Sequence, residues 1–251
     1  LGIDPSSYYK ERGRNVIITR QVLLDNLAWF LSKKQKFGFA LSADAERTIK
    51  GKIEELYRDI GYRTTFRLDV YQNNMKLRGD HPAMGMRSKD MQLFANCALD
   101  DDEQVKQLRG DADVMAMFKE YYSDINIYDK GKEIIHWKMP RGIEEGLCRI
   151  QNNLLSTIKE RKISIETCPT SNFMIGPFER YDQLPLLKFL DNLNDCNISI
   201  NTDDKGIIAT SIEAEYALIA AAMKKNNVGD IEIANRLKQI ITGAKKSRFG
   251  I

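Results

Sequence analysis

Histidine is scarce in this sequence: the 251 residues include only two, His81 and His136. Long apolar runs are missing as well, because no stretch approaches the roughly eighteen residues that a membrane-spanning helix needs. The first residues show no basic segment followed by an apolar one, so we expect no secretory signal there. These shortages exclude a metal site built from three or more histidines of this chain. They favour a cytoplasmic protein without membrane contact.

Cysteine and one-sided charge are limited too. The four cysteines, Cys97, Cys148, Cys168 and Cys196, are widely spaced and form no Cys-x-x-Cys pair. Each has apolar neighbours, so we expect buried free thiols rather than zinc ligands. The net charge is only +3 and the basic residues are scattered, so nucleic acid is not an expected partner.

What the sequence does contain is enough apolar material for one large core, at 43% of its residues. From about residue 130 onward, expected strands alternate with expected helices, which is the rhythm of a parallel α/β sheet. We expect strands at 65–71 and 91–99 and near residues 133, 163 and 198, and a long loop over 72–90. We expect helices over 16–35, 43–60, 113–122, 143–162, 184–193, 210–225 and 231–241.

Two of the expected strands end in short polar motifs. Residues 198–206 read Ile-Ser-Ile-Asn-Thr-Asp-Asp-Lys-Gly, so a buried strand leads into the adjacent carboxylates Asp203 and Asp204. Residues 163–172 read Ile-Ser-Ile-Glu-Thr-Cys-Pro-Thr-Ser-Asn, and Cys168 precedes Asp203 by 35 positions. In α/β barrels, the active-site residues lie at the carboxyl ends of the strands, where these carboxylates are expected. An Asp-Asp pair is also common in solvated turns, and this alternative stays open.

Together these two motifs resemble the C-terminal part of the adenosine and AMP deaminase family, over residues 163–223. The resemblance implies a TIM-type (β/α)8 barrel of the metal-dependent hydrolase kind. It also implies a zinc ion that activates a water for the hydrolytic deamination of a purine. Five expected strands do not close an eight-stranded barrel, so we expect the barrel to be incomplete or degenerate in this chain.

The resemblance assigns roles to residues of this chain by position. Asp203 would bind the metal, and Asp204 would contact the base. His136, at the end of an earlier expected strand, would be a further zinc ligand; a core or strand-end histidine is the alternative. Lys205 beside the pocket would suit a substrate phosphate. The Ser171-Asn172 pair would shape the floor of the site.

Several parts of the family site are absent from this sequence. The family uses a His-x-His, a His-Ala-Gly-Glu and a Gly-His-Gly segment, whereas this chain has no His-x-His and too few histidines for the set. Met139 stands where the family has its catalytic glutamate. The place of the Gly-His-Gly segment falls near residues 142–146, where Glu144 and Glu145 either supply carboxylates or form a solvated first helical turn. No catalytic residue is assigned.

The segment after the aspartates resembles particular relatives. Lys205-Gly206, followed by Ala-Thr-Ser-Ile-Glu-x-Glu-Tyr, replaces the proline of members that act on free adenosine. It is similar to divergent bacterial deaminases of antiviral-defence and CRISPR-associated systems, some of which are large oligomers. The implied partners are adenosine or an adenine nucleotide, and further copies of the chain or a partner chain. Residues 1–60 are expected to form a helical N-terminal elaboration and 61–251 the deaminase-like barrel portion.

Three functions remain open. The first is a purine deaminase of which this chain is one portion, with the His-x-His part supplied by further sequence or by a partner chain. The second is a degenerate deaminase fold that keeps a nucleoside pocket and acts as a scaffold or regulatory subunit. The third is another TIM-barrel hydrolase, since fold resemblance alone does not fix chemistry.

Overall fold

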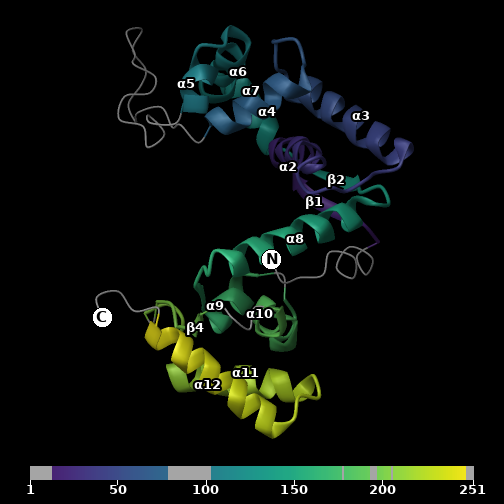
Figure 1. Cartoon of the computed structure of the whole chain (residues 1–251). Helices are drawn as coiled ribbons and strands as arrows, with labels where there is room; N and C mark the ends of the chain where they lie inside the picture. The colour runs from purple at the N-terminus through teal and green to yellow at the C-terminus, as the bar shows by residue number, and fades with distance from the viewer. Residues whose placement is uncertain (1–12, 79–102, 177, 193–196, 205, 247–251) are drawn as a thin grey trace. The chain divides into compact units, whose positions relative to one another are not determined.

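The computed structural model describes residues 13–78, 103–176, 178–192, 197–204 and 206–246 (Figure 1). Contacts within the chain divide it into two compact units. The N-terminal unit contains the described residues up to Leu147, and the C-terminal unit contains those from Cys148 onward. The expectation that 1–60 and 61–251 form separate portions stays a prediction. The boundary between the two compact units lies elsewhere, between Leu147 and Cys148.

The N-terminal unit is mostly helical. It contains a two-stranded antiparallel sheet whose strands pair with Asn15 opposite Lys138 and Thr19 opposite Ile134. The helix predicted over residues 43–60 is confirmed as α3 (Ala43–Ile60), and both of its ends have clear physical causes. Ser42 accepts the Ala45 N–H at its start, and Gly61, at φ +93°, ends it in the left-handed region. The elements are β1 (Asn15–Thr19), α2 (Arg20–Lys33), α3 (Ala43–Ile60), α4 (Leu68–Leu77), α5 (Glu103–Arg109), α6 (Ala112–Ser123), α7 (Ile125–Lys132) and β2 (Ile134–Lys138).

Two predictions for this unit are wrong. Residues 16–19 belong to β1 and not to a helix, because their β-branched side chains pair with β2. Residues 68–71 begin helix α4 and not a strand. The buried residues Val70, Tyr71, Asn74 and Leu77 recur at helical spacing, a period that continues beyond the short window which suggested alternation. The predicted strand at 91–99 and most of the predicted loop at 72–90 lie outside the described residues.

The C-terminal unit contains the parallel pair that the sequence predicts. Ile165 lies opposite Ile198 and Thr167 opposite Ile200, so the two strands point the same way. Their apolar side chains join helical residues in one core that includes Leu186, Ile219 and Ile240. The elements are the greater part of α8 (Ile143–Glu160), β3 (Ile165–Thr167), α9 (Pro169–Ile175), the 3-10 helix η1 (Tyr181–Gln183), α10 (Pro185–Asn192), β4 (Ile198–Ile200), α11 (Ile212–Lys225) and α12 (Asp230–Lys246).

Helix α12 lies against the edge of β4 that does not face β3. The hydrogen bonds from Ile165 to Asn197 and from Asn201 to Thr167 show that the main-chain groups of Ile198 point away from β3. Gly243 of α12 approaches this edge so closely that a Cβ there would lie 2.7 Å from the Ile198 oxygen and 3.0 Å from its nitrogen. A further strand could therefore not pair with β4 at Ile198 while α12 stays in place.

The expected five-stranded parallel sheet is only partly present. Within the described residues, the four strands form two separate pairs, one antiparallel and one parallel, and no closed barrel. The strand near residue 133 is confirmed as β2, but its partner is β1 and its pairing is antiparallel. The helices predicted at 113–122, 143–162, 184–193, 210–225 and 231–241 are confirmed as α6, α8, α10, α11 and α12. No helix in the described part of the chain is long and apolar enough to cross a membrane.

Candidate functional site

The two polar motifs lie at the same end of the parallel pair. The Asn201 N–H donates to the Thr167 oxygen over 2.9 Å, so the strands are still side by side where each one ends. Beyond Thr167 the chain turns at Cys168 into helix α9, and beyond Asn201 it enters the turn that contains Asp203 and Asp204. Parallel pairing therefore brings together two segments that are far apart in the sequence.

A direct hydrogen bond joins the two motifs. Ser171 is buried in α9, and its hydroxyl donates to Asp203 Oδ2 over 2.6 Å. The other oxygen, Oδ1, accepts the Asp204 N–H over 2.9 Å. Asp203 has a φ of +59°, in the left-handed region that residues other than glycine seldom adopt. These two bonds fix the Asp203 carboxylate in one orientation, although the side chain itself is exposed.

Asp204 shapes the turn that follows. Its Oδ1 accepts the Gly206 N–H over 2.8 Å, and its main-chain oxygen accepts the N–H groups of Ile207 and Ile208. Its second carboxylate oxygen, Oδ2, has no bond to the described residues, and the side chain is exposed. Asp204 is therefore free to accept a further donor from solvent or from a ligand. The predicted phosphate contact, Lys205, lies outside the described residues.

The Cys168 thiol lies against this turn. Burial raises the pKa of Cys168, and the nearby charges of Asp203 and Glu166 raise it further. A thiol with a raised pKa is mostly protonated at neutral pH, so Cys168 is a poor nucleophile and a poor metal ligand. Neither Cys168 nor Cys148 forms a disulfide with a described residue, and both are half-buried rather than buried as predicted. The other two cysteines lie outside the described residues.

A residue that the sequence analysis missed connects this turn to helix α11. The Glu215 side chain has no exposed surface, and it accepts the Thr170 N–H over 2.9 Å and the Thr210 hydroxyl over 2.6 Å. Ser211 begins the helix by accepting the Ala214 N–H. A glutamate among the inward-facing positions Ile212, Tyr216 and Ile219 was the available signal, because ionisable residues are seldom buried without a partner.

The other predicted metal ligand lies elsewhere. His136 is exposed on β2, in the N-terminal unit, where it pairs across the sheet with Ile17. Asp203 belongs to the C-terminal unit, so the structure does not bring the two residues into one compact unit. Within the described residues, no group of three or more His, Cys, Asp or Glu side chains could hold a metal ion. Asn172 donates to the Thr167 hydroxyl at the foot of the site.

Glu144 has a structural partner. Arg14 donates to Glu144 Oε1 from Nε over 2.8 Å and from Nη2 over 2.7 Å, and the Gly142 N–H donates to Oε2. Burial raises the pKa of Glu144, but the hydrogen bonds from the main chain and from Arg14 more than offset this, and the pKa lies below its ordinary value. Glu144 is thus buried, which contradicts the solvated turn proposed for it, whereas Glu145 is exposed. Met139, in the place of the family's acid, is buried too.

Replacing Arg14 by alanine is expected to destabilise the N-terminal unit by about 1–3 kcal/mol at pH 7, because Glu144 would stay buried without its donor. A carboxyl whose folded pKa is lowered stabilises the fold above its unfolded pKa. This contribution is lost as the pH falls through the folded value, so the loss in the wild type occurs below the ordinary pKa of 4.5. Urea unfolding between pH 3 and 7 measures both effects. The exposed neighbour Arg141→Ala should change stability by less than about 0.5 kcal/mol.

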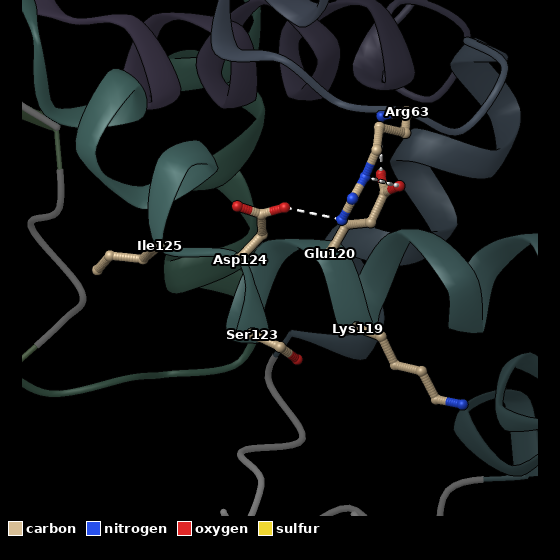
Figure 2. A pocket seen from close by; sticks show the side chains of 6 residues that line it. All are labelled: Arg63, Lys119, Glu120, Ser123, Asp124 and Ile125. Carbon is tan, nitrogen blue, oxygen red and sulfur yellow. Dashed lines mark hydrogen bonds and ion pairs between the residues drawn. The ribbon is translucent and has the colours of Figure 1, made fainter.

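The N-terminal unit also contains a surface depression of about 400 Å³ (Figure 2). Arg63 reaches both acids that line it and donates to Asp124 Oδ2 over 2.7 Å, with Glu120 3.7 Å away. Glu120 also accepts the hydroxyl of Thr64, and Asp124 begins helix α7 by accepting the Asn126 N–H. The charged groups at the centre of this depression are paired with one another, and they connect α6 and α7 to the loop after α3.

The geometry of the C-terminal unit is that of an α/β fold. Its parallel strand pair presents carboxylates at the carboxyl end, with a helix after each strand, which is where such folds hold their functional sites. Comparison with known proteins gives the family. The adenosine deaminase family model matches residues 138–246, and this part of the chain belongs to that family.

Individual relatives agree with the family match. An adenosine deaminase of Shewanella denitrificans is 39% identical over 70 residues, which are 28% of this chain and 20% of that protein. An adenosine deaminase of Clostridium botulinum is 39% identical over 62 residues, 25% of this chain and 18% of that one. A third, of Pseudoalteromonas translucida, is 38% identical over 82 residues, 32% and 23% of the two chains. The chain thus matches about a fifth of the length of these curated relatives.

Proposed function

We propose that the Asp203–Asp204 turn is the purine-binding end of a deaminase-like protein whose ligand is adenosine or an adenine nucleotide. The observation that carries the proposal is the 2.6 Å hydrogen bond from Ser171 to Asp203. It joins the two motifs at one strand end inside the segment that matches the adenosine deaminase family. The reaction proposed for the whole protein is hydrolytic deamination, with ammonia as a product.

The side chains of this turn suit different parts of a nucleoside. Asp204 is exposed and has an unused carboxylate oxygen, which can accept a hydrogen bond from a ring N–H or an amino group. Lys205 follows directly in the sequence, and its ammonium group would favour a nucleotide over a nucleoside. Asp203 is held by Ser171 and by its own turn, so it offers a fixed carboxylate beside this position.

The described residues do not fit a complete zinc site. Asp203 is the one predicted ligand at this strand end; each of its oxygens accepts one hydrogen bond and keeps a second lone pair. A zinc site needs three or four nitrogen, sulfur or oxygen ligands, and no such group exists in the described residues. The assignments of Asp203 and His136 as zinc ligands stay predictions from the resemblance. We derive no catalytic step through a metal from this chain.

A catalytically inactive, purine-binding scaffold or regulatory subunit is the second candidate. The buried Met139 in place of an acid and the ion-paired Glu144 favour it. A thioether has no exchangeable proton, and a carboxylate whose pKa is lowered is a weaker base. Another TIM-barrel hydrolase is the third candidate. A role in antiviral defence and an oligomer or partner chain remain expectations from the resemblance to the divergent bacterial deaminases. A cytoplasmic location remains an expectation from the composition of the sequence.

Calorimetric titration with adenosine and AMP tests the proposal. Saturable binding of at least one is expected, and Asp204→Ala should weaken it about tenfold or more, the typical effect of losing a charged hydrogen-bond acceptor. Glu160→Ala, which removes an exposed acid at the end of α8, is the control and should leave affinity unchanged. No purine binding by the wild-type chain would favour the third candidate.

Ammonia release and metal content separate the first two candidates. Turnover with about one zinc per chain would contradict the scaffold, whereas purine binding without either would support it. Lys205→Ala should weaken AMP binding more than adenosine binding if the lysine contacts a phosphate.

A further inference from the structure

Glu215 is an unusual residue for the buried face of helix α11, whose other buried residues are apolar. Its side chain is completely buried, and each of its carboxylate oxygens accepts one hydrogen bond. No ion pair joins it to a cation among the residues that the structure describes. Burying a carboxylate with neutral donors alone is costly, so an apolar residue at this position of α11 would serve stability better. Its two bonds indicate what it does instead.

The two bonds connect segments that meet at the candidate site. The Thr170 N–H, which donates to Glu215 Oε2, belongs to the first turn of α9 and directly precedes Ser171. Ser171 in turn donates to Asp203. The second donor, Thr210, belongs to the segment that runs from the Asp203–Asp204 turn into α11. Glu215 therefore bonds to both segments that the hydrogen bond between Ser171 and Asp203 joins: α9, and the segment that follows Asp203.

We propose that Glu215 is a positioning residue, which sets the orientation of the Asp203 carboxylate by holding the first turn of α9 against the start of α11. No hydrogen bond joins it to Asp203 or Asp204 among the described residues, and it acts through Thr170 and Ser171. Its consequence for purine binding rests on the function proposed above. Its effect on the geometry of the turn does not.

Two substitutions distinguish positioning from a need for charge. In Glu215→Gln, the amide oxygen can accept the Thr170 N–H while the amide NH2 group donates to the Thr210 hydroxyl, because a hydroxyl both donates and accepts. Both connections are kept and the charge is lost. In Glu215→Ala, both connections are lost. Glu213→Ala is the matched control, since Glu213 lies in the same turn of the same helix but is exposed.

Purine affinity is the first readout. Glu215→Ala is expected to weaken adenosine binding about tenfold, whereas Glu215→Gln and Glu213→Ala stay within about twofold of the wild type. Unchanged binding in Glu215→Ala would overturn the proposal. Equal losses in the Gln and Ala variants would also overturn it, because they would show that the charge and not the connection matters.

The Cys168 thiol gives a second readout that does not depend on purine binding. Cys168 precedes α9 and is half-buried against the Asp203 turn. Alkylation by iodoacetamide at pH 8, followed by mass spectrometry of the tryptic peptide 163–180, measures its exposure in the full chain. Both variants remove the Glu215 charge, which contributes to the raised pKa of Cys168, so the rate rises somewhat in each. Glu215→Ala should react about fivefold faster than Glu215→Gln, because only the alanine variant also loses both connections. If the wild-type chain binds no purine, these rates still decide the role of Glu215.

Circular dichroism shows whether Glu215→Ala folds. If it does not fold, a second variant that preserves the shape of the site tests the proposal. Thr210→Val removes one donor to Glu215 and preserves the volume of the side chain. It should raise the alkylation rate of Cys168 about twofold, and an unchanged rate would contradict the proposal.

Discussion

Asp25→Ala is expected to destabilise the N-terminal unit by about 3–5 kcal/mol, because it leaves a buried guanidinium without its counter-ion. Arg78 is 9% exposed and donates from Nη1 to Asp25 Oδ1 over 2.7 Å. The same oxygen accepts the hydroxyl of Tyr71 over 2.6 Å. Asp25 is only partly exposed, so water cannot fully replace it. A loss of this size is a large fraction of the 5–15 kcal/mol that a typical domain has.

The aromatic surroundings of Arg78 make the stability of the N-terminal unit depend more strongly on Asp25. The guanidinium lies 3.9 Å from the centre of the Tyr121 ring and 5.0 Å from that of Tyr71. Its Nη2 is buried and has no hydrogen-bond partner among the described residues, so the group already bears one unsatisfied donor. Without Asp25, the Arg78 charge would be stabilised by the faces of the two tyrosine rings and by Asn74, which accepts a hydrogen bond from Nε.

Tryptophan fluorescence measures the unfolding of the N-terminal unit selectively. The chain has two tryptophans, Trp29 in α2 and Trp137 in β2, and both belong to the N-terminal unit. Urea unfolding followed by fluorescence should show the full loss in Asp25→Ala and about half of it in Asp25→Asn, which keeps an acceptor but no charge. Asp59→Ala, an exposed acid of α3, should change stability by less than about 0.5 kcal/mol. Equal stability of Asp25→Ala and wild type would show that Arg78 needs no counter-ion.

The sequence predicted the C-terminal unit well because its signals are local. Each strand is a short apolar run that ends in a polar motif, and each helix has an apolar stripe with a defined start. In the N-terminal unit, residues 16–19 are a strand because β2 lies beside them, and β2 is more than 110 positions away in the sequence. Pairing over such a distance leaves no local signal, so the helical pattern that follows was extended backward into the strand.

The candidate site was predicted in part for the same reason. Asp203, Asp204 and Ser171 are found from motifs that are contiguous in the sequence. Glu215 is not, because its role depends on the Thr170 N–H, which is 45 positions away. A main-chain donor has no residue type, so no sequence pattern marks it. The burial of Glu144 was not predicted for a similar reason, since its partner Arg14 is 130 positions away in the sequence.

Gly243→Ala is expected to destabilise the C-terminal unit although alanine is the better helix former. Intrinsic propensity favours alanine over glycine by about 1 kcal/mol in a helix interior. At Gly243, however, the new Cβ would lie 2.7 Å from the Ile198 oxygen, a main-chain atom of a strand whose neighbouring residues Asn197 and Asn201 are bonded to β3. Overpacking of this kind costs about 1–3 kcal/mol, so we expect a net loss of up to about 2 kcal/mol. Gly243→Val, which is larger and β-branched, should lose more.

Gly51→Ala is the matched control, because Gly51 also lies inside a helix but nothing is within 4 Å of its Cβ position. This variant should gain about 0.5–1 kcal/mol, so the two Gly→Ala changes have opposite signs. Circular dichroism during urea unfolding measures both variants, and fluorescence isolates the N-terminal unit for Gly51. A gain in stability for Gly243→Ala would mean that α12 does not lie on β4. Since β4 leads into Asp203 and Asp204, loss of α12 from its edge should also weaken purine binding, whereas Gly51→Ala should not.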